Sequence, residues 1–192
     1  MSDLFSTAAD LTRFAQMYLN GGSLDGVRLF EPGTIQAFTR VQFAEFSNRA
    51  LGWETPTGTN SAGRLMRRPA FGHTGFTGTS LWIDPANDRF VILLTNRVHE
   101  PRAKRPGIVI ADVRHDVADA AALAITDAPE LSEAIASHAA RAAEKLREDG
   151  LVASSIVVFI RTNQHRIDQE QYRGDEMEPL DPPTDDARAI CA

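Results

Sequence analysis

One ten-residue segment, residues 71–80, constrains the fold of this chain more than any other. It holds three glycines, three threonines, one serine and a histidine, and it runs directly into Leu-Trp-Ile-Asp-Pro at residues 81–85. A second segment, Phe-Val-Ile-Leu-Leu-Thr-Asn at residues 90–96, follows after a short interval and begins with five apolar residues. Two such runs around a turn predict a β-hairpin, here with its turn at residues 84–88. Glycine inside a strand marks a bulge or the close approach of a ligand or another backbone.

This segment has two interpretations. A strand edge with N–H groups and hydroxyls beside His73 is suited to holding an acyl oxygen or a carboxylate. The alternative is a glycine-rich turn with a solvated histidine, and an isolated glycine-rich motif does not decide between them.

Periodicity and turn residues predict the elements around the hairpin. Ser6-Thr7 is a helix N-cap region, and the helix that follows extends to about Leu19, before the Asn20-Gly21-Gly22 stop. Pro32 begins a second, short helix. Residues 51–54 start a strand, and apolar residues at helical spacing predict a helix over 108–125.

The net charge of −6 is unevenly distributed. Residues 1–127 carry 13 basic and 13 acidic side chains, whereas residues 128–192 carry 7 basic and 13 acidic ones. Such a shift indicates a second unit of different origin. We therefore expect a boundary near Thr126-Asp127, with units over 1–126 and 127–192.

The second unit has its own pattern. Residues 128–148 have an amphipathic helical spacing, residues 154–162 form a β-branched strand, residues 176–180 suggest another strand, and Thr184 is a candidate helix cap. The predicted fold class is α+β: an antiparallel sheet fragment with flanking helices, followed by a small partial αββ module.

The composition argues against a transmembrane helix, a secretory signal and a metal site. No run of eighteen apolar residues exists, which excludes a transmembrane helix and leaves no membrane partner. The N-terminus lacks a basic region followed by an apolar run, so we expect a cytoplasmic location. Cys191 is the single cysteine, and the five histidines show no metal-ligand spacing. We expect no metal and no cofactor.

Four motifs occur in an order that resembles a known family. They are the block Asp-Leu-Phe-Ser-Thr-Ala-Ala-Asp-Leu-Thr-Arg-Phe at 3–14, Asn-Gly-Gly at 20–22, Leu-Gly-Trp at 51–53 and His-Thr-Gly at 73–75. Residues 1–125 are similar to the C-terminal part of the serine β-lactamase-like family, which includes class C β-lactamases, DD-peptidases and related esterases.

The resemblance implies a substrate cleft. His73, Thr74 and Gly75 would line it, with Thr77 to Ser80 on the same strand. A backbone N–H there would contribute to an oxyanion hole, which stabilises the negative charge of a tetrahedral intermediate. The implied ligand is an acyl-type small molecule: a β-lactam, a peptide or an ester.

The chemistry of that family also needs a nucleophilic serine followed three residues later by a lysine. The chain has two lysines, Lys104 and Lys145, and the residues three positions before them are Pro101 and Ala142. A Tyr-x-Asn triplet begins at Tyr18, but Tyr18 lies at helical spacing among apolar residues and is interpreted as a packing residue. We therefore expect a truncated hydrolase that is not catalytic alone.

The C-terminal unit resembles part of the little-finger domain of a Y-family translesion DNA polymerase of the polymerase V type. The motifs are Ala-Ala-Arg-Ala-Ala-Glu-Lys-Leu-Arg at 139–147, Val-Phe-Ile-Arg-Thr-Asn at 158–163 and Pro-Thr-Asp-Asp at 183–186. The resemblance implies contacts to DNA phosphates from a set of four residues: Arg161, Thr162, Asn163 and Arg166. The acidic balance of the unit opposes DNA binding, because phosphate neutralisation needs excess Lys and Arg.

Three functional hypotheses follow: an acyl-transfer enzyme, a nucleic-acid-binding module related to translesion repair, or a non-catalytic fusion of two gene fragments. The preferred hypothesis is a hydrolase fragment fused to a little-finger-like segment, with DNA binding as the alternative. A severed sheet exposes an unpaired edge and an apolar face, so self-association is expected.

Overall fold

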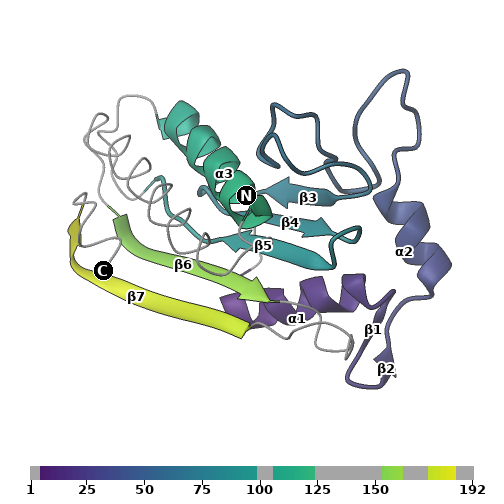
Figure 1. Ribbon diagram of the computed structural model, residues 1–192, viewed down its shortest axis with the longest axis horizontal. Coiled ribbons are helices and arrows are strands. Elements are labelled where there is room, and N and C mark those ends of the chain that lie inside the picture. The colour runs from purple at the N-terminus through teal and green to yellow at the C-terminus, as the bar shows by residue number, and fades with distance from the viewer. Residues whose placement is uncertain (1–4, 99–105, 124–152, 162–172, 185–192) are drawn as a thin grey trace.

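The computed structural model of the chain describes residues 5–98, 106–123, 153–161 and 173–184. Its elements in chain order are α1 (Ala8–Leu19), β1 (Ser23–Leu24), β2 (Val27–Arg28), α2 (Pro32–Thr39), β3 (Phe71–Thr74), β4 (Ser80–Asp84), β5 (Arg89–Leu93), α3 (Pro106–Leu123), β6 (Ala153–Arg161) and β7 (Arg173–Thr184) (Figure 1). Small antiparallel sheets flanked by helices confirm the α+β fold class.

The central sheet has the antiparallel order β3-β4-β5, with α1 on one face and α3 on the other (Figure 1). Side chains alternate between the faces. On the face toward α1, Ala15 of the helix packs with four strand residues: Phe71, Ile83, Phe90 and Ile92. On the face toward α3 there are two clusters between the sheet and the helix. One contains Met66, Trp82, Val91, Ala118 and Ala121, and the other contains Leu93, Val109, Ile110 and Val113. Burial on both faces explains why β5 is a continuous apolar run.

The predicted hairpin turn is confirmed, because β4 ends at Asp84 and β5 begins at Arg89. A buried ion pair closes this turn. Arg89 Nη2 lies 2.8 Å from Asp84 Oδ2, and the two side chains are 9% and 1% exposed. Arg89 Nη1 also donates to the Ala122 carbonyl oxygen over 3.1 Å, so the same guanidinium attaches the turn to α3.

The N-terminal helix begins and ends where the sequence predicts. Thr7 is its N-cap and its hydroxyl accepts from the Asp10 N–H, and Gly21 and Gly22 follow its end with positive φ. The β1–β2 hairpin was not predicted. Its turn is Asp25-Gly26, with φ of 51° and 79°, and an Asp-Gly pair of this kind favours a type I′ hairpin turn.

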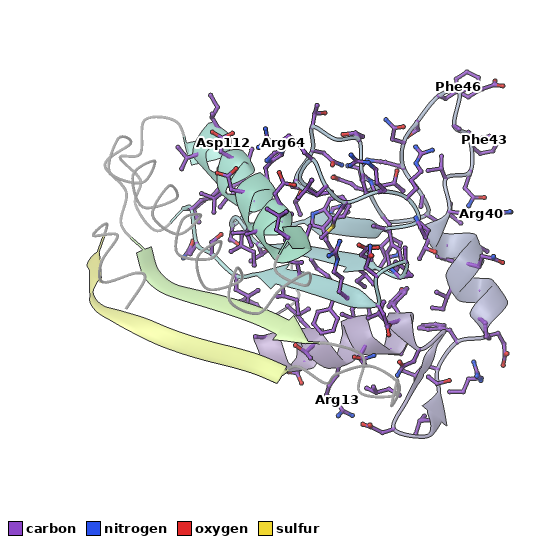
Figure 2. All side chains as sticks on the ribbon, viewed as in Figure 1. Arg13, Arg40, Phe43, Phe46, Arg64 and Asp112 are labelled. Atoms are coloured by element: carbon purple, nitrogen blue, oxygen red, sulfur yellow. The ribbon has the colours of Figure 1, made fainter. Side chains whose placement is uncertain are left out.

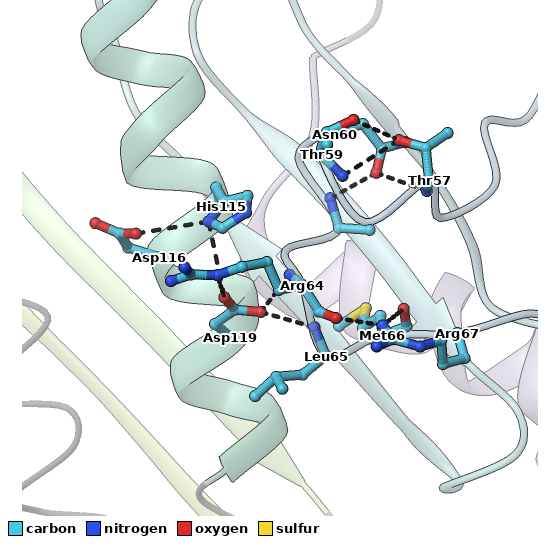
Figure 3. A network of polar contacts seen from close by, with 11 residues as sticks. Thr57, Thr59, Asn60, Arg64, Leu65, Met66, Arg67, His115, Asp116 and Asp119 are labelled. Carbon is cyan, nitrogen blue, oxygen red and sulfur yellow. Dashed lines mark hydrogen bonds and ion pairs between the residues drawn. The ribbon is translucent and has the colours of Figure 1, made fainter.

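A long loop leads from residue 55 to β3, and α3 holds it in place (Figure 3). Asp119 Oδ1 accepts the N–H groups of Arg64 (2.6 Å) and Leu65 (3.0 Å), and Oδ2 lies 3.3 Å from Arg64 Nε. Gly63, with φ of +76°, leaves room for this carboxylate, because a Cβ there would lie 2.3 Å from Asp119 Oδ1. The anchored loop then places Met66 in the core.

The predicted strands of the C-terminal unit are present as β6 and β7, which pair antiparallel in a separate sheet from Arg161↔Arg173 to Ala153↔Thr184. β7 is longer than the expected 176–180, and Thr184, the expected helix cap, is its last residue. β6 lies beside β5 (Figure 1). The helix expected over 128–148 lies outside the described residues.

Candidate functional site

The outer edge of β3 is covered along only part of its length. The Gly72 N–H donates to the Glu54 carbonyl oxygen (3.0 Å) and the Gly72 carbonyl accepts from the Glu54 N–H (2.7 Å). Backbone groups alternate in direction along a strand, so the N–H and C=O of Thr74 face the same outer edge as those of Gly72. Among the described strands none pairs with β3 there. The Thr74 N–H on this part of the edge can donate to an extended ligand, whereas the Thr74 carbonyl oxygen lies 2.9 Å from His73 Nδ1.

His73 lies on this edge with an exposed side chain. Its Nδ1 is 2.9 Å from the Thr74 carbonyl oxygen, and its Nε2 is 3.5 Å from Arg49 Nη1. A carbonyl can only accept, so Nδ1 carries the proton in this arrangement and Nε2 faces the guanidinium as acceptor. Arg49 is also paired with Glu54 at 2.8 Å. The ring is therefore oriented from both sides.

Arg114 of α3 holds the turn that follows β3. Its Nη2 donates to the carbonyl oxygens of Gly75 (2.6 Å) and Thr79 (2.9 Å), and its Nε donates to that of Gly78 (2.9 Å). Burial lowers the pKa of Arg114, the nearby Arg97 lowers it further, and Glu54 opposes the shift. Arginine remains charged under such perturbation, so the guanidinium is a permanent anchor for three carbonyl groups.

The other side of the turn is held by Arg97. Its backbone N–H donates to the Thr77 carbonyl (2.7 Å), its Nε donates to the Phe76 carbonyl (2.5 Å), and its guanidinium lies 4.6 Å from the centre of the Phe76 ring. Turn residues 75–79 are thus fixed from two directions next to the open strand edge. A pre-organised edge binds a ligand without first having to become ordered.

The expectation that Thr77 to Ser80 continue the strand of His73 is wrong. β3 ends at Thr74, Gly75 and Thr77 belong to the turn, and Ser80 begins β4 opposite Thr74. The reason is the Gly75 N–H, which donates to the Thr79 carbonyl and folds the chain back. Ser80 is buried, and its predicted place in a substrate cleft stays a prediction.

The side chains of His73 and Thr74 also cannot share one face of the sheet. Alternation puts His73 on the face of its cross-strand partner Leu81 and Thr74 on the face of Ser80. What these residues have in common is strand β3, in which the N–H and C=O of Thr74 face the outer edge and those of His73 face Leu81 in β4. Arg49, Arg97 and Arg114 were missed from the sequence, because three isolated arginines have no spacing that marks their convergence.

Among the described residues around this edge, none forms the serine and lysine pair that the nucleophilic chemistry of the resembled family needs. No Ser-x-x-Lys occurs in the 192 residues, and both lysines lie outside the described residues. Tyr18 is a packing residue, as predicted: its ring lies 5.0 Å from that of Phe14, 5.3 Å from that of Trp53 and 5.6 Å from that of Phe71. Burial raises its pKa, so the phenol stays protonated at neutral pH, where it cannot accept a proton as a general base.

Three of the four expected DNA-contact residues, Thr162, Asn163 and Arg166, lie outside the described residues, and Arg161 ends β6. The DNA contact therefore stays a prediction. Within the described ranges no group of three His, Cys, Asp or Glu side chains is placed to hold a metal ion. The described helices include none that is both long and apolar enough to cross a bilayer.

Comparison with known proteins finds two families in the chain. The Beta-lactamase family model matches residues 1–115, and the model of the impB/mucB/samB family C-terminal domain matches residues 120–192. These matches confirm both resemblances and their order.

Curated relatives match about half of the chain. Proteins described as putative D-alanyl-D-alanine carboxypeptidase, from Salmonella paratyphi B (strain ATCC BAA-1250 / SPB7) and Salmonella newport (strain SL254), are each 39% identical to the chain over 103 residues. The alignment covers 52% of this chain and 24% of each relative, so the chain spans about a quarter of their length. Because the Beta-lactamase model covers more than half of its residues, the chain belongs to the β-lactamase family, and it carries an impB/mucB/samB-type segment after that part.

Proposed function

We propose that residues 1–115 form one wall of an acyl-transfer cleft, in which the β3 edge binds a peptide or a β-lactam. The observation that carries this proposal is the uncovered edge at Thr74, beside a turn that Arg114 and Arg97 hold in one conformation. An edge of this kind adds an extended peptide as a further strand through main-chain hydrogen bonds. The carboxypeptidase relatives support a peptide or β-lactam as the class of ligand.

Under the same proposal, residues 1–115 do not catalyse acyl transfer by themselves. Acyl transfer needs an activated nucleophile beside the group that stabilises the oxyanion. The chain offers a backbone donor at Thr74, but no serine with a lysine three residues later. Binding without turnover is therefore the activity that we expect.

Backbone recognition at Thr74 can be tested with two variants. Titration of the labelled chain with a peptide ending in D-Ala-D-Ala should shift the amide signals of residues 74–76. Thr74→Pro removes the outward N–H, and proline is tolerated at the edge of a sheet, so the shifts should disappear while the fold persists. Thr74→Val keeps the N–H and serves as the matched control, with binding retained.

Two results would count against this function. One is the absence of peptide-induced shifts at residues 74–76 in the parent chain. The other is equal loss of binding in Thr74→Val and Thr74→Pro, which would assign recognition to the hydroxyl. Turnover of a chromogenic β-lactam by the isolated chain would contradict the second half of the proposal.

A second candidate function, binding of DNA, is favoured by the family match over residues 120–192. The residues that would contact the DNA phosphates are Arg161, Thr162, Asn163 and Arg166. Binding should weaken steeply with salt, because cations released from DNA dominate such affinity. Arg161→Ala should weaken it while the exposed Arg13→Ala does not; absence of binding to primer–template DNA at low salt would remove this candidate.

A further inference from the structure

Phe76 is an exposed aromatic residue in the turn that connects β3 to β4. Its side chain is 71% exposed, and it follows two residues after Thr74, the last residue of β3. Single exposed apolar side chains are common on proteins and by themselves indicate no site. Phe76 differs from such a residue because hydrogen bonds hold its backbone and a cation holds its ring.

Arg97 contacts both the backbone and the ring of Phe76. Its Nε donates to the Phe76 carbonyl oxygen over 2.5 Å, and its guanidinium lies 4.6 Å from the centre of the ring. A cation at this distance is attracted by the aromatic face. The neighbouring carbonyl oxygens, of Gly75 and Thr77, accept hydrogen bonds from Arg114 Nη2 and the Arg97 N–H. One guanidinium covers one face, so the remaining surface of this exposed ring is open to a ligand.

The ring lies within reach of a peptide that pairs with the β3 edge. Consecutive Cα atoms are about 3.8 Å apart, so those of Thr74 and Phe76 are separated by at most about 7.6 Å. A peptide bonded to the outward Thr74 N–H would run about 4.8 Å from β3 and advance about 3.4 Å per residue. A side chain one or two residues from the bonded position therefore comes level with Phe76.

We propose that Phe76 determines ligand specificity at the β3 edge, by stacking with an aromatic group of the bound peptide or acyl compound. This inference rests on the proposed function and adds the class of side chain that the edge prefers. Pairs of aromatic rings are stabilised beyond the area that they bury. A ring that Arg97 already holds also loses little conformational freedom when a ligand binds. Phe76 contacts the ligand and takes no part in proton transfer.

The experiment titrates the labelled 192-residue chain with acetyl-Ala-Ala-D-Ala-D-Ala and with two peptides in which phenylalanine replaces one of the L-alanines. One phenylalanine peptide should bind about two- to tenfold more tightly than the alanine peptide, as measured by the amide shifts of residues 74–76. Phe76→Ala should abolish this preference, whereas Phe76→Tyr, which retains a ring, should keep it. Phe46 is 87% exposed and projects from the loop after α2 (Figure 2), so Phe46→Ala is the matched control and should keep the preference.

Three outcomes would overturn the specificity role while leaving the proposed function in place. The parent chain could bind all three peptides equally, or the preference could survive in Phe76→Ala. In the third, Phe76→Ala weakens every peptide by the same factor, which would assign the ring to holding the turn and not to selecting a ligand. A parent chain without peptide-induced shifts at residues 74–76 would instead reject the proposed function, and the specificity role with it.

Discussion

Arg114 Nη2 lies 2.6 Å from the carbonyl oxygen of Gly75, across a sequence separation of 39 residues. This contact joins α3 to the turn after β3, and two further hydrogen bonds from the same guanidinium reach Gly78 and Thr79. The open strand edge thus depends on a helix that is contributed much later in the chain. Its geometry is a tertiary property and not a property of the glycine-rich motif.

We predict that Arg114→Gln loosens residues 75–79. A hydrogen bond to a charged group contributes about 1.5–3 kcal/mol to stability. We therefore expect the free energy of unfolding to fall by about 2 kcal/mol. Amide exchange at residues 75–79 should accelerate more than in β4. Arg13→Gln, which breaks an exposed ion pair with Asp25, should cost less than about 1 kcal/mol. Unchanged exchange in the turn would contradict the anchoring role.

Replacing one member of the buried pair of Arg89 and Asp84 should lower the free energy of unfolding more than the Arg114 change does. Arg89→Met leaves the Asp84 carboxylate buried with only Asn87 as a side-chain partner. Removing one member of a buried pair costs about 3–5 kcal/mol, because the other charge stays desolvated. Denaturant unfolding should report this loss. The double variant Asp84→Leu with Arg89→Met should recover much of it, and a double variant as unstable as the single one would contradict this explanation.

Gly72 is predicted to be intolerant of any side chain. A Cβ at this position would lie 2.4 Å from both Trp82 Cδ2 and the Leu81 carbonyl oxygen. Gly72→Ala should therefore cost about 1–3 kcal/mol through overpacking against the buried indole. Gly33→Ala in α2 meets nothing within 4 Å and should be neutral or stabilising by up to about 1 kcal/mol. Thermal unfolding of the two variants checks the contrast.

The boundaries of α1, the start of α2 and the β4–β5 turn could be predicted because local signals specify them, whereas α3 was expected over 108–125 and spans Pro106–Leu123. Thr7 caps α1, Gly21 and Gly22 end it, and the residues between β4 and β5 are turn formers. The strand containing His73 was predicted too long because Gly75 and Thr79 pair with each other. The alternative interpretation, a glycine-rich turn beside an exposed histidine, describes residues 75–79 and His73 as the structure has them.

The candidate site itself was only partly predictable. The motif at residues 73–75 located the edge, but the side chains that orient it come from three other segments, at Arg49, Arg97 and Arg114. Arginines are usually surface residues, so sequence alone gives no reason to bring these three together. Convergence of this kind follows from how α3 and the loop before β3 pack on the sheet.

Tyr18 provides a prediction for the dependence of stability on pH. Burial raises its pKa above the usual 10.0, and a hydrogen bond with Trp53 partly offsets the shift. Above pH 10 the unfolded chain loses this proton while the folded chain keeps it, so the free energy of unfolding should fall as pH rises toward the folded pKa. Below pH 10 the contribution is fully present. Tyr18→Phe should remove this part of the pH dependence.

The measurement uses the chain with Tyr172→Phe, in which Tyr18 is the single tyrosine. The ultraviolet absorbance of tyrosinate should then rise with a midpoint above pH 10 in the folded protein and near pH 10 in denaturant. A residue that shuttles protons at neutral pH needs a pKa close to the working pH. For a tyrosine this means a lowered pKa, whereas burial raises the pKa of Tyr18. A midpoint below pH 10 in the folded chain would therefore contradict the packing role of Tyr18. Proton transfer by the Tyr-x-Asn triplet would then have to be considered again.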